Sequence, residues 1–237
     1  MSVVEVQSKS EVVELPDVFV QWQCDERKRV YDGLLKKEMP KFWGAHLPVL
    51  STLNDLRSAH PIRLSNKGVG LLPRQEHLDA YLDEIAVCLS ACEGRPPNET
   101  RTERVVVARK LYENPEHIER TTLGTIEIFL GQTYKNLGKD PRCCLLFTGG
   151  GPRYPSYEFS CRAEIVLETE KRFRFIKGMR LLFEMERFHI QQPQFLLGYV
   201  FHVGRNADKT PHRVQPRASG CPFHSRAPAN TSDIRSS

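Results

Sequence analysis

The 237-residue chain has no long apolar run, since even stretches such as LLGYVFHV fall far short of the roughly 20 residues that a membrane-spanning helix needs. Its N-terminus, MSVVEVQSKSEVVELPD, lacks the basic-then-apolar pattern of a secretory signal. Seven cysteines, an odd number without such a signal, argue against a disulfide framework and favour reduced, mostly buried thiols. We therefore expect a protein of the cytoplasm or nucleus that is not secreted and has no transmembrane segment.

Catalytic and metal-binding motifs are also missing. No CxxC or HxxxH spacing occurs, and Cys88 and Cys92, four residues apart in a helical pattern, supply only half of a zinc site. The glycines at 149–151 lack the GxxxxGK[ST] spacing of a phosphate-binding loop, and no histidine stands in an order that nominates a catalytic triad. We expect no catalytic residue and no metal ligand, which favours a binding or assembly protein over an enzyme.

What the chain does contain is a series of short β-patterned runs over residues 123–203. These are LGTIEIFL, CCLLF, SYEFSCRAEIVLE, RFRFIKGMRLLFEMERFHI and FLLGYVFHV, and RVVVARKLY at 104–112 predicts a strand before them. The connections are too short for parallel crossovers, so we predict an antiparallel sheet over 104–203. The residues expected to be buried in it are Phe129, Leu146, Phe159, Ile165, Phe175, Leu182 and Tyr199.

The N-terminal half has helical periodicity instead. The strongest helical pattern is RQEHLDAYLDEIAVCLSACEG at 74–94. Its apolar residues Leu78, Leu82, Ile85 and Leu89 follow one another at spacings of four, three and four, and Gly94 stands at the C-terminal capping position. Residues 24–37 and 47–56 predict two further helices, and RLSNKGVGLLPR at 63–74 predicts a loop or hairpin. The predicted class is α+β, with a helical N-terminal half, an antiparallel C-terminal half and a disordered basic tail. Its expected divisions are a flexible acidic segment at 1–20, a helical region at 21–95, a linker at 96–103, a β-rich domain at 104–203 and the tail at 204–237.

Positive charge is concentrated in that tail. Residues 204–237 carry six Lys and Arg against two Asp, which accounts for four of the chain's net charge of +5. Regularly spaced prolines favour an extended chain whose cations can follow a phosphate backbone or an anionic lipid surface. The alternative is a solvated tail that only aids solubility. The predicted polyanion-binding residues are Arg205, Lys209, Arg213, Arg217 and Arg226.

One family resemblance covers residues 154–191, YPSYEFSCRAEIVLETEKRFRFIKGMRLLFEMERFHIQ. This stretch is similar to the C-terminal half of rhabdovirus matrix proteins, and the matching positions are Arg162-Ala163, Phe173, Lys177-Gly178, 181–185 and 189–191. The resemblance implies a non-enzymatic assembly protein of the virion that self-associates and binds ribonucleoprotein and the host membrane, with no cofactor. A β-domain with a basic tail also resembles plant-virus movement proteins, which implies binding of single-stranded nucleic acid.

A second resemblance covers residues 125–149, TIEIFLGQTYKNLGKDPRCCLLFTG. This stretch resembles the central part of flavin-binding split-barrel proteins of the pyridoxamine-phosphate oxidase type, and YEFSCRAEIV resembles their next strand. It implies an FMN-dependent oxidoreductase in which Lys135 and Arg142 contact the cofactor phosphate. We recognise no counterpart of that family's opening hairpin in residues 60–122. The sequence therefore ranks matrix-type assembly first, movement or other nucleic-acid binding second, and flavin-dependent oxidation third.

Overall fold

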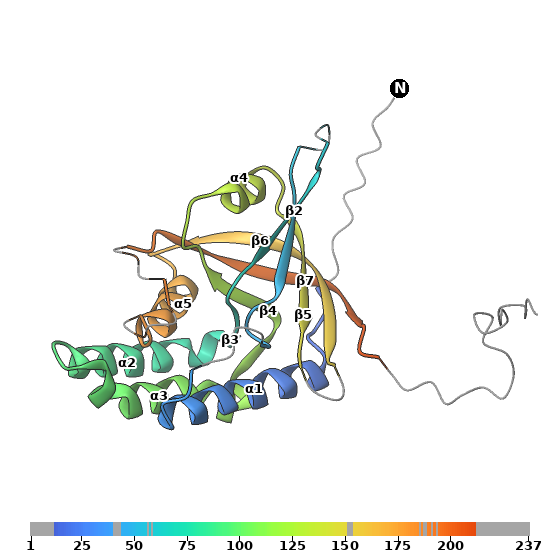
Figure 1. Ribbon diagram of the computed structural model, residues 1–237. Coiled ribbons are helices and arrows are strands. Elements are labelled where there is room, and N and C mark those ends of the chain that lie inside the picture. The colour runs from blue at the N-terminus through green and yellow to red at the C-terminus, as the bar shows by residue number, and fades with distance from the viewer. Residues whose placement is uncertain are drawn as a thin grey trace, which may run out of the picture.

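A computed structural model describes residues 12–39, 44–55, 57, 59–150, 154–184, 186, 189–190, 192 and 194–211 (Figure 1). The helices are α1 (Asp17–Leu35), α2 (Gln75–Cys92), α3 (Pro97–Glu113), α4 (Gln132–Lys139) and α5 (Lys171–Leu181), with a 3₁₀ turn at Pro115–His117. The strands are β1 (Val49–Leu53), β2 (Ile62–Asn66), β3 (Val69–Pro73), β4 (Ile118–Ile126), β5 (Arg142–Thr148), β6 (Ser156–Leu167) and β7 (Leu197–Asp208).

The strands form one antiparallel sheet in the order β2-β1-β5-β6-β7-β4-β3. The two strands at the ends of this order, β2 and β3, are separated in sequence by only Lys67 and Gly68. Asn66 still pairs with β1, whereas Val69 already pairs with β4. One continuous segment thus changes pairing partner and joins the two ends of the sheet, so the sheet curls into a barrel.

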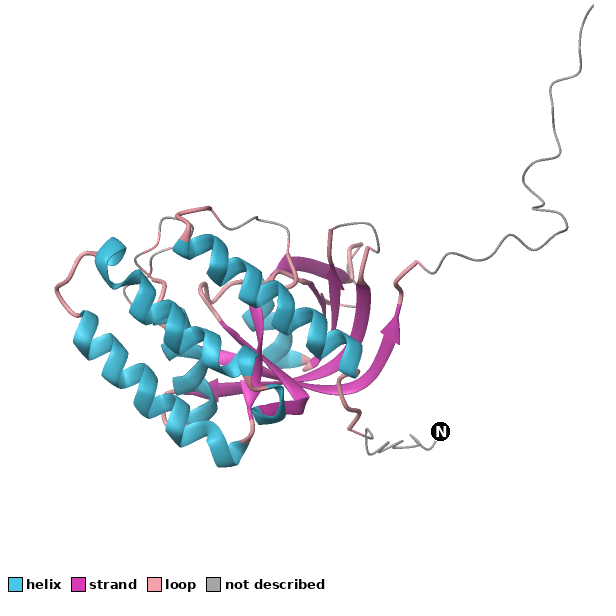
Figure 2. Ribbon diagram, turned by 90° about the horizontal axis from the view of Figure 1, so that it is seen from below, coloured by secondary structure: helices cyan, strands magenta, loops and turns pink. Residues whose placement is uncertain are grey.

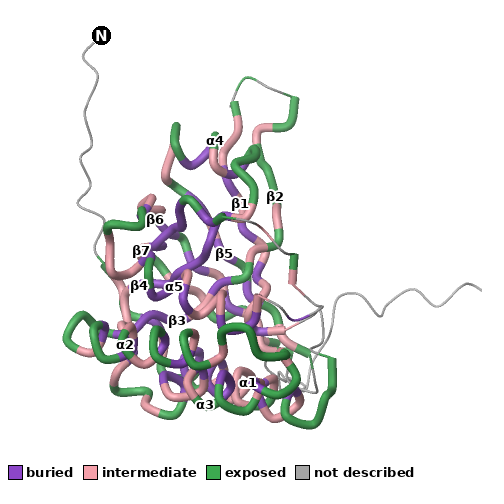
Figure 3. Tube along the Cα trace, turned by 90° about the vertical axis from the view of Figure 1, so that its left-hand side faces the viewer, coloured by how far each residue is buried: buried purple, intermediate pink, exposed green. Residues whose placement is uncertain are grey.

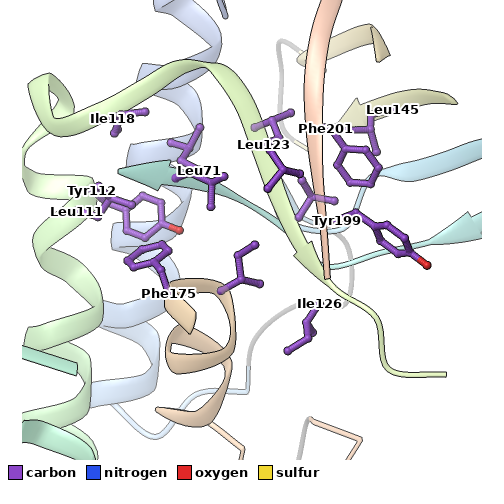
Figure 4. Close-up of a cluster of buried hydrophobic side chains, with 14 of the residues drawn as sticks. Leu71, Leu111, Tyr112, Ile118, Leu123, Ile126, Leu145, Phe175, Tyr199 and Phe201 are labelled. Atoms are coloured by element: carbon purple, nitrogen blue, oxygen red, sulfur yellow. The ribbon is translucent and has the colours of Figure 1, made fainter. Parts of the chain in front are cut away.

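Alternating side chains fill the inside of this barrel. On β5, Leu145 and Phe147 are buried while their neighbours are more exposed, which is the period-two pattern of a strand with one packed face. Helix α1 closes one end, because the ring of Phe19 lies 5.0 Å from that of Phe147 and 4.7 Å from that of Phe159. Figure 4 shows further aromatic and aliphatic side chains of the same core, among them Tyr199 and Phe201.

Helices α1, α2 and α3 lie side by side in a layer on one side of the barrel (Figure 2). Helix α5 packs between α2 and the outer face of the sheet at β4 and β7. Two glycines permit this close approach. A Cβ at Gly124 would lie 2.9 Å from Ile176 Cδ1 on α5, and one at Gly198 would lie 3.3 Å from Phe173 Cδ2 on α5. The Gly198 Cβ would also lie 2.6 Å from the Thr125 carbonyl oxygen on β4.

The antiparallel α+β class is confirmed, but the predicted division of the chain is wrong because helices and strands alternate along it. Residues 47–56, predicted as a helix, contain β1, and residues 63–74 supply most of β2 and all of β3. The RVVVARKLY run predicted as a strand lies in α3, where Val105, Ala108 and Leu111 are buried at helical spacing. Packing against α1 and α2 thus overrides the β-propensity of its valines.

Three further expectations are also wrong. The predicted linker at 96–103 is mostly the first turns of α3, in which Pro97 takes the first helical position, where its missing N–H costs nothing. The predicted strand that begins RFRFIKG is α5, whose Phe173 and Ile176 face the sheet. The aliphatic strand implied by the matrix-protein resemblance at 181–185 does not form in its described part, since residues 182–184 are a turn that follows α5.

Four of the seven expected core residues, namely Phe159, Phe175, Leu182 and Tyr199, are buried, and Ile165 is partly buried. Phe129 is 56% exposed because β4 ends before it, and Leu146 is 36% exposed because it lies on the outer face of β5. The β-domain also extends further than expected, since β7 continues to Asp208. Within the described residues, no helix combines the length and apolarity needed to cross a bilayer.

The close contact at Gly198 yields a stability prediction. Gly198→Ala places a methyl group against the backbone of β4, which cannot move without disturbing the ladder, so we expect a loss of about 1–3 kcal/mol. Gly138→Ala is the matched control, because no atom lies within 4 Å of its added Cβ on α4 and alanine favours a helix by about 0.5–1 kcal/mol. Urea unfolding measures both, and equal stabilities of the two variants would contradict the packing described.

Candidate functional site

The segment from β4 through α4 to β5 closes the second end of the barrel. Helix α4 turns Thr133, Asn136 and Leu137 inward, whereas Lys135 on the same helix is exposed. The Asn136 side-chain amide donates a hydrogen bond of 3.1 Å to Thr52 Oγ1 on β1. The hydroxyls of Thr133 and Ser65 lie 3.3 Å apart, which ties α4 to β2 as well. The helix that presents Lys135 is therefore held firmly on the rim of the barrel.

A buried carboxylate fixes the loop that enters α4. Glu127 is 3% exposed, and its Oε1 accepts hydrogen bonds from Lys67 Nζ at 2.7 Å and from the Phe129 N–H at 3.1 Å. Its Oε2 accepts the hydroxyl of Tyr199 at 2.9 Å. Burial and the neighbouring Glu127 raise the pKa of Tyr199 far above its usual value, so this hydroxyl stays a donor. Glu127 thus connects the barrel closure, the core and the loop before α4.

Arg142 begins β5 just after α4, and its side chain is 67% exposed on the outer face. Asp140 orients it: Arg142 Nη2 donates to Oδ2 at 2.6 Å, and Arg142 Nε donates to Oδ1 at 3.0 Å. These hydrogen bonds lower the pKa of Asp140, so the carboxylate is ionised at neutral pH. Lys135 and Arg142, the two residues that the flavoprotein resemblance implies, are thus both accessible within one short segment.

Beside Arg142 lies an apolar stretch of sheet surface. Ile62 and Leu64 on β2 are 58% and 64% exposed, and the register aligns Leu64 with Ser51 of β1, which in turn pairs with Cys144 of β5. Residues 142, 144 and 146 of β5 share this outer face because side chains alternate along a strand. We call the outer side of β2, β1 and β5 the apolar sheet face; Figure 3 shows the exposed stretch of β2. An apolar surface with cations at its edge suits a planar ligand that carries a negative group.

The predicted polyanion-binding residues of the tail lie only partly within the described structure. Arg205 is an exposed residue of β7, and Lys209, just after β7, forms an ion pair of 3.0 Å with Glu158. Arg213, Arg217 and Arg226 lie outside the described residues. Residues 204–208, expected to belong to the tail, are therefore part of β7, and the first two basic residues of the expected tail lie in or next to this strand.

The cysteine pair on α2 belongs to the helical layer. The sulfur atoms of Cys88 and Cys92 are 4.0 Å apart, and burial raises the pKa of Cys88 to about 11. Cys92 also lines a cavity of about 330 Å³ between α2, α3 and α5, together with the buried Arg104. Among the described residues, no group of three or more His, Cys, Asp or Glu side chains is placed to hold a metal ion.

Two features of the site were not predicted from the sequence. β1 and β2 form an antiparallel hairpin within residues 49–66, mostly ahead of the range 60–122 in which no opening hairpin was recognised. Arg162 on β6 lies directly opposite Arg142. Because only strand pairing brings residues 142 and 162 together, no sequence motif signals this contact.

Comparison with known proteins gave matches only among solved structures: no protein-family model matches the chain, and no curated protein does. A candidate pyridoxamine 5′-phosphate oxidase from Listeria innocua has a TM-score of 0.39 and 10% identity, covering 77% of this chain and 97% of its own. An FMN-binding protein from Syntrophomonas wolfei subsp. wolfei has a TM-score of 0.40 and 8% identity, covering 80% and 90%. HupZ of Group A Streptococcus has a TM-score of 0.38 and 13% identity, covering 77% and 92%. All three TM-scores are below 0.5.

The Lys67–Glu127 pair gives a second prediction. Its side chains are only 14% and 1% exposed, so Glu127→Gln leaves a buried ammonium without its counter-ion and should destabilise the protein by about 3–5 kcal/mol. Lys67→Met should also destabilise it, because Glu127 then keeps its charge without a cation. The double variant removes both charges and should lose clearly less than the sum of the single losses. Additive losses in urea unfolding would show that the pair is not coupled.

Proposed function

We propose that the protein binds FMN on the apolar sheet face and acts as a flavin-dependent protein of the split-barrel type. The observation that carries this proposal is the position of the TYKNLGKDPR stretch, which forms α4 and the start of β5 at the edge of an exposed apolar face. The motif that resembles flavoproteins therefore lies where a flavin has both an apolar surface and cations within reach.

The resemblance also requires an opening hairpin that builds half of the barrel and much of the flavin pocket. Residues 49–73 meet this requirement, because β1, β2 and β3 complete the barrel and supply Ile62 and Leu64 to the apolar sheet face. The proposal is thus supported by two parts of the chain that are far apart in sequence. Within the described residues, no comparable observation favours ribonucleoprotein or membrane binding.

In this proposal the ring system of the flavin lies against the aliphatic side chains of β2 and β5. Its phosphate lies toward Lys135 and Arg142, and Asp140 holds the guanidinium of Arg142 in place before the ligand arrives. Bound FMN would supply electron- or hydride-transfer chemistry, while the chain binds and orients it and shields one side from water.

Titration of FMN with the purified protein, followed by flavin fluorescence, tests the proposal. We expect saturable binding, and we expect Arg142→Gln and Lys135→Gln each to weaken it by about 10-fold or more through loss of a charge-assisted contact to phosphate. Their affinity for riboflavin, which has no phosphate, should change little. Lys139→Gln, at an exposed lysine of the same helix, is the matched control and should leave both affinities unchanged. Absence of saturable FMN binding by the unaltered protein would overturn the proposal.

A further inference from the structure

Two exposed arginines face each other across the outer side of the barrel. Arg142 of β5 and Arg162 of β6 are direct register partners, and both side chains are exposed. Side chains of directly opposed residues in an antiparallel pair have Cβ atoms about 4.5–5.5 Å apart, and like charges in such positions repel each other. An anion bound between the two guanidinium groups would remove this repulsion.

The acidic side chains nearby balance only part of this charge. Asp140 holds Arg142, Glu158 pairs with Lys209, and Glu164 binds Arg172 at 2.7 Å and His202 Nε2 at 2.7 Å. Arg162 has no side-chain hydrogen bond or ion pair to any residue that the structure describes. Asp140, whose pKa Arg162 helps to lower, already binds Arg142. Glu164, two residues along the same face of β6, is bound to His202, the register partner of Arg162 on β7.

The apolar sheet face ends at this pair. Arg142 shares its side of β5 with Cys144 and Leu146, and Arg162 extends that row onto β6, away from β1 and β2. A ligand whose apolar part covers β1 and β2 therefore reaches Arg142 first and Arg162 next. Two guanidinium groups on adjacent strands can donate several parallel N–H bonds to one phosphate group, which Lys cannot do as well.

We propose that Arg162 is a second phosphate-binding residue, and that with Arg142 it forms a cross-strand clamp for the phosphate group of the ligand. The identification of that ligand as FMN rests on the proposed function. The chemistry of the clamp is that of a phosphate monoester or free phosphate, so the test separates these two sources.

The experiment compares the unaltered chain with Arg162→Gln, Arg162→Lys and Arg174→Gln. Arg174 is an exposed arginine of α5, outside the sheet, and its change removes the same charge. Each protein is titrated with FMN and with riboflavin by fluorescence, and with inorganic phosphate by line broadening in phosphorus NMR. Thermal unfolding of every variant confirms that it is folded.

We expect Arg162→Gln to weaken FMN binding by about 10- to 100-fold and to leave riboflavin binding unchanged. Arg162→Lys should recover only part of the loss, and Arg174→Gln should match the unaltered chain. If the unaltered chain binds FMN and Arg162→Gln binds it equally well, the clamp is wrong and the proposed function stands. If FMN does not bind but phosphate binds in a way that depends on Arg162, the proposed function fails and the clamp stands. If neither ligand binds, both are overturned.

Discussion

Lys67 lies between β2, which pairs with β1, and β3, which pairs with β4. Its ammonium group forms an ion pair with the buried carboxylate of Glu127. Placing two charges in the core is unfavourable unless their hydrogen-bonding groups find partners. Here the carboxylate accepts three donors, from Lys67, Phe129 and Tyr199, and each comes from a different part of the barrel. The pair is therefore satisfied in only one arrangement of β3, β4 and β7, which fixes the point at which the barrel closes.

This closure also determines where a ligand can bind. Because α4 follows the loop held by Glu127, its position on the barrel rim, and with it the start of β5, depends on the same carboxylate. The helices α2, α3 and α5 gather on the side of β3, β4 and β7, so the outer side of β2, β1 and β5 keeps its aliphatic side chains exposed. The candidate site is thus a consequence of how the sheet closes and of which side the helices cover.

Local patterns predicted those parts of the fold that depend on local sequence. The α2 helix could be read from its apolar spacing, and β5 and the first part of β6 from their alternation. Residues 63–74 were predicted only as a loop or hairpin, and not as two strands that pair with β1 and β4, because Ile62 and Leu64 are exposed on the outside and the glycines Gly68 and Gly70 interrupt any alternation. The α3 helix was read as a strand because its three consecutive valines have β-propensity, which tertiary packing overrides.

The candidate site was only half predictable, for a different reason. Lys135 and Arg142 belong to one contiguous motif, whereas Arg162 reaches the site through strand pairing. The β1–β2 hairpin was missed because residues 47–56 were predicted as a helix, and the pairing of β3 with β4 was missed because α2, α3 and the 3₁₀ turn separate these strands along the chain.

The helices α2 and α3, which lie between β3 and β4 in the chain, are stabilised by buried hydrogen bonds and ion pairs. Arg104 on α3 is buried and donates to the Thr100 hydroxyl, to the Leu182 carbonyl and to Glu186, so its polar groups are satisfied without any ligand. Arg101 adds a second cation to Glu186, and despite burial these two arginines lower the pKa of that carboxyl. Arg101 and Arg104 are thus matched by acceptors in the helical layer, whereas Arg162 on the outer face of β6 is not. Satisfied charge stabilises the helical layer, and the unmatched charge of Arg162 at the edge of the apolar sheet face remains available for a ligand.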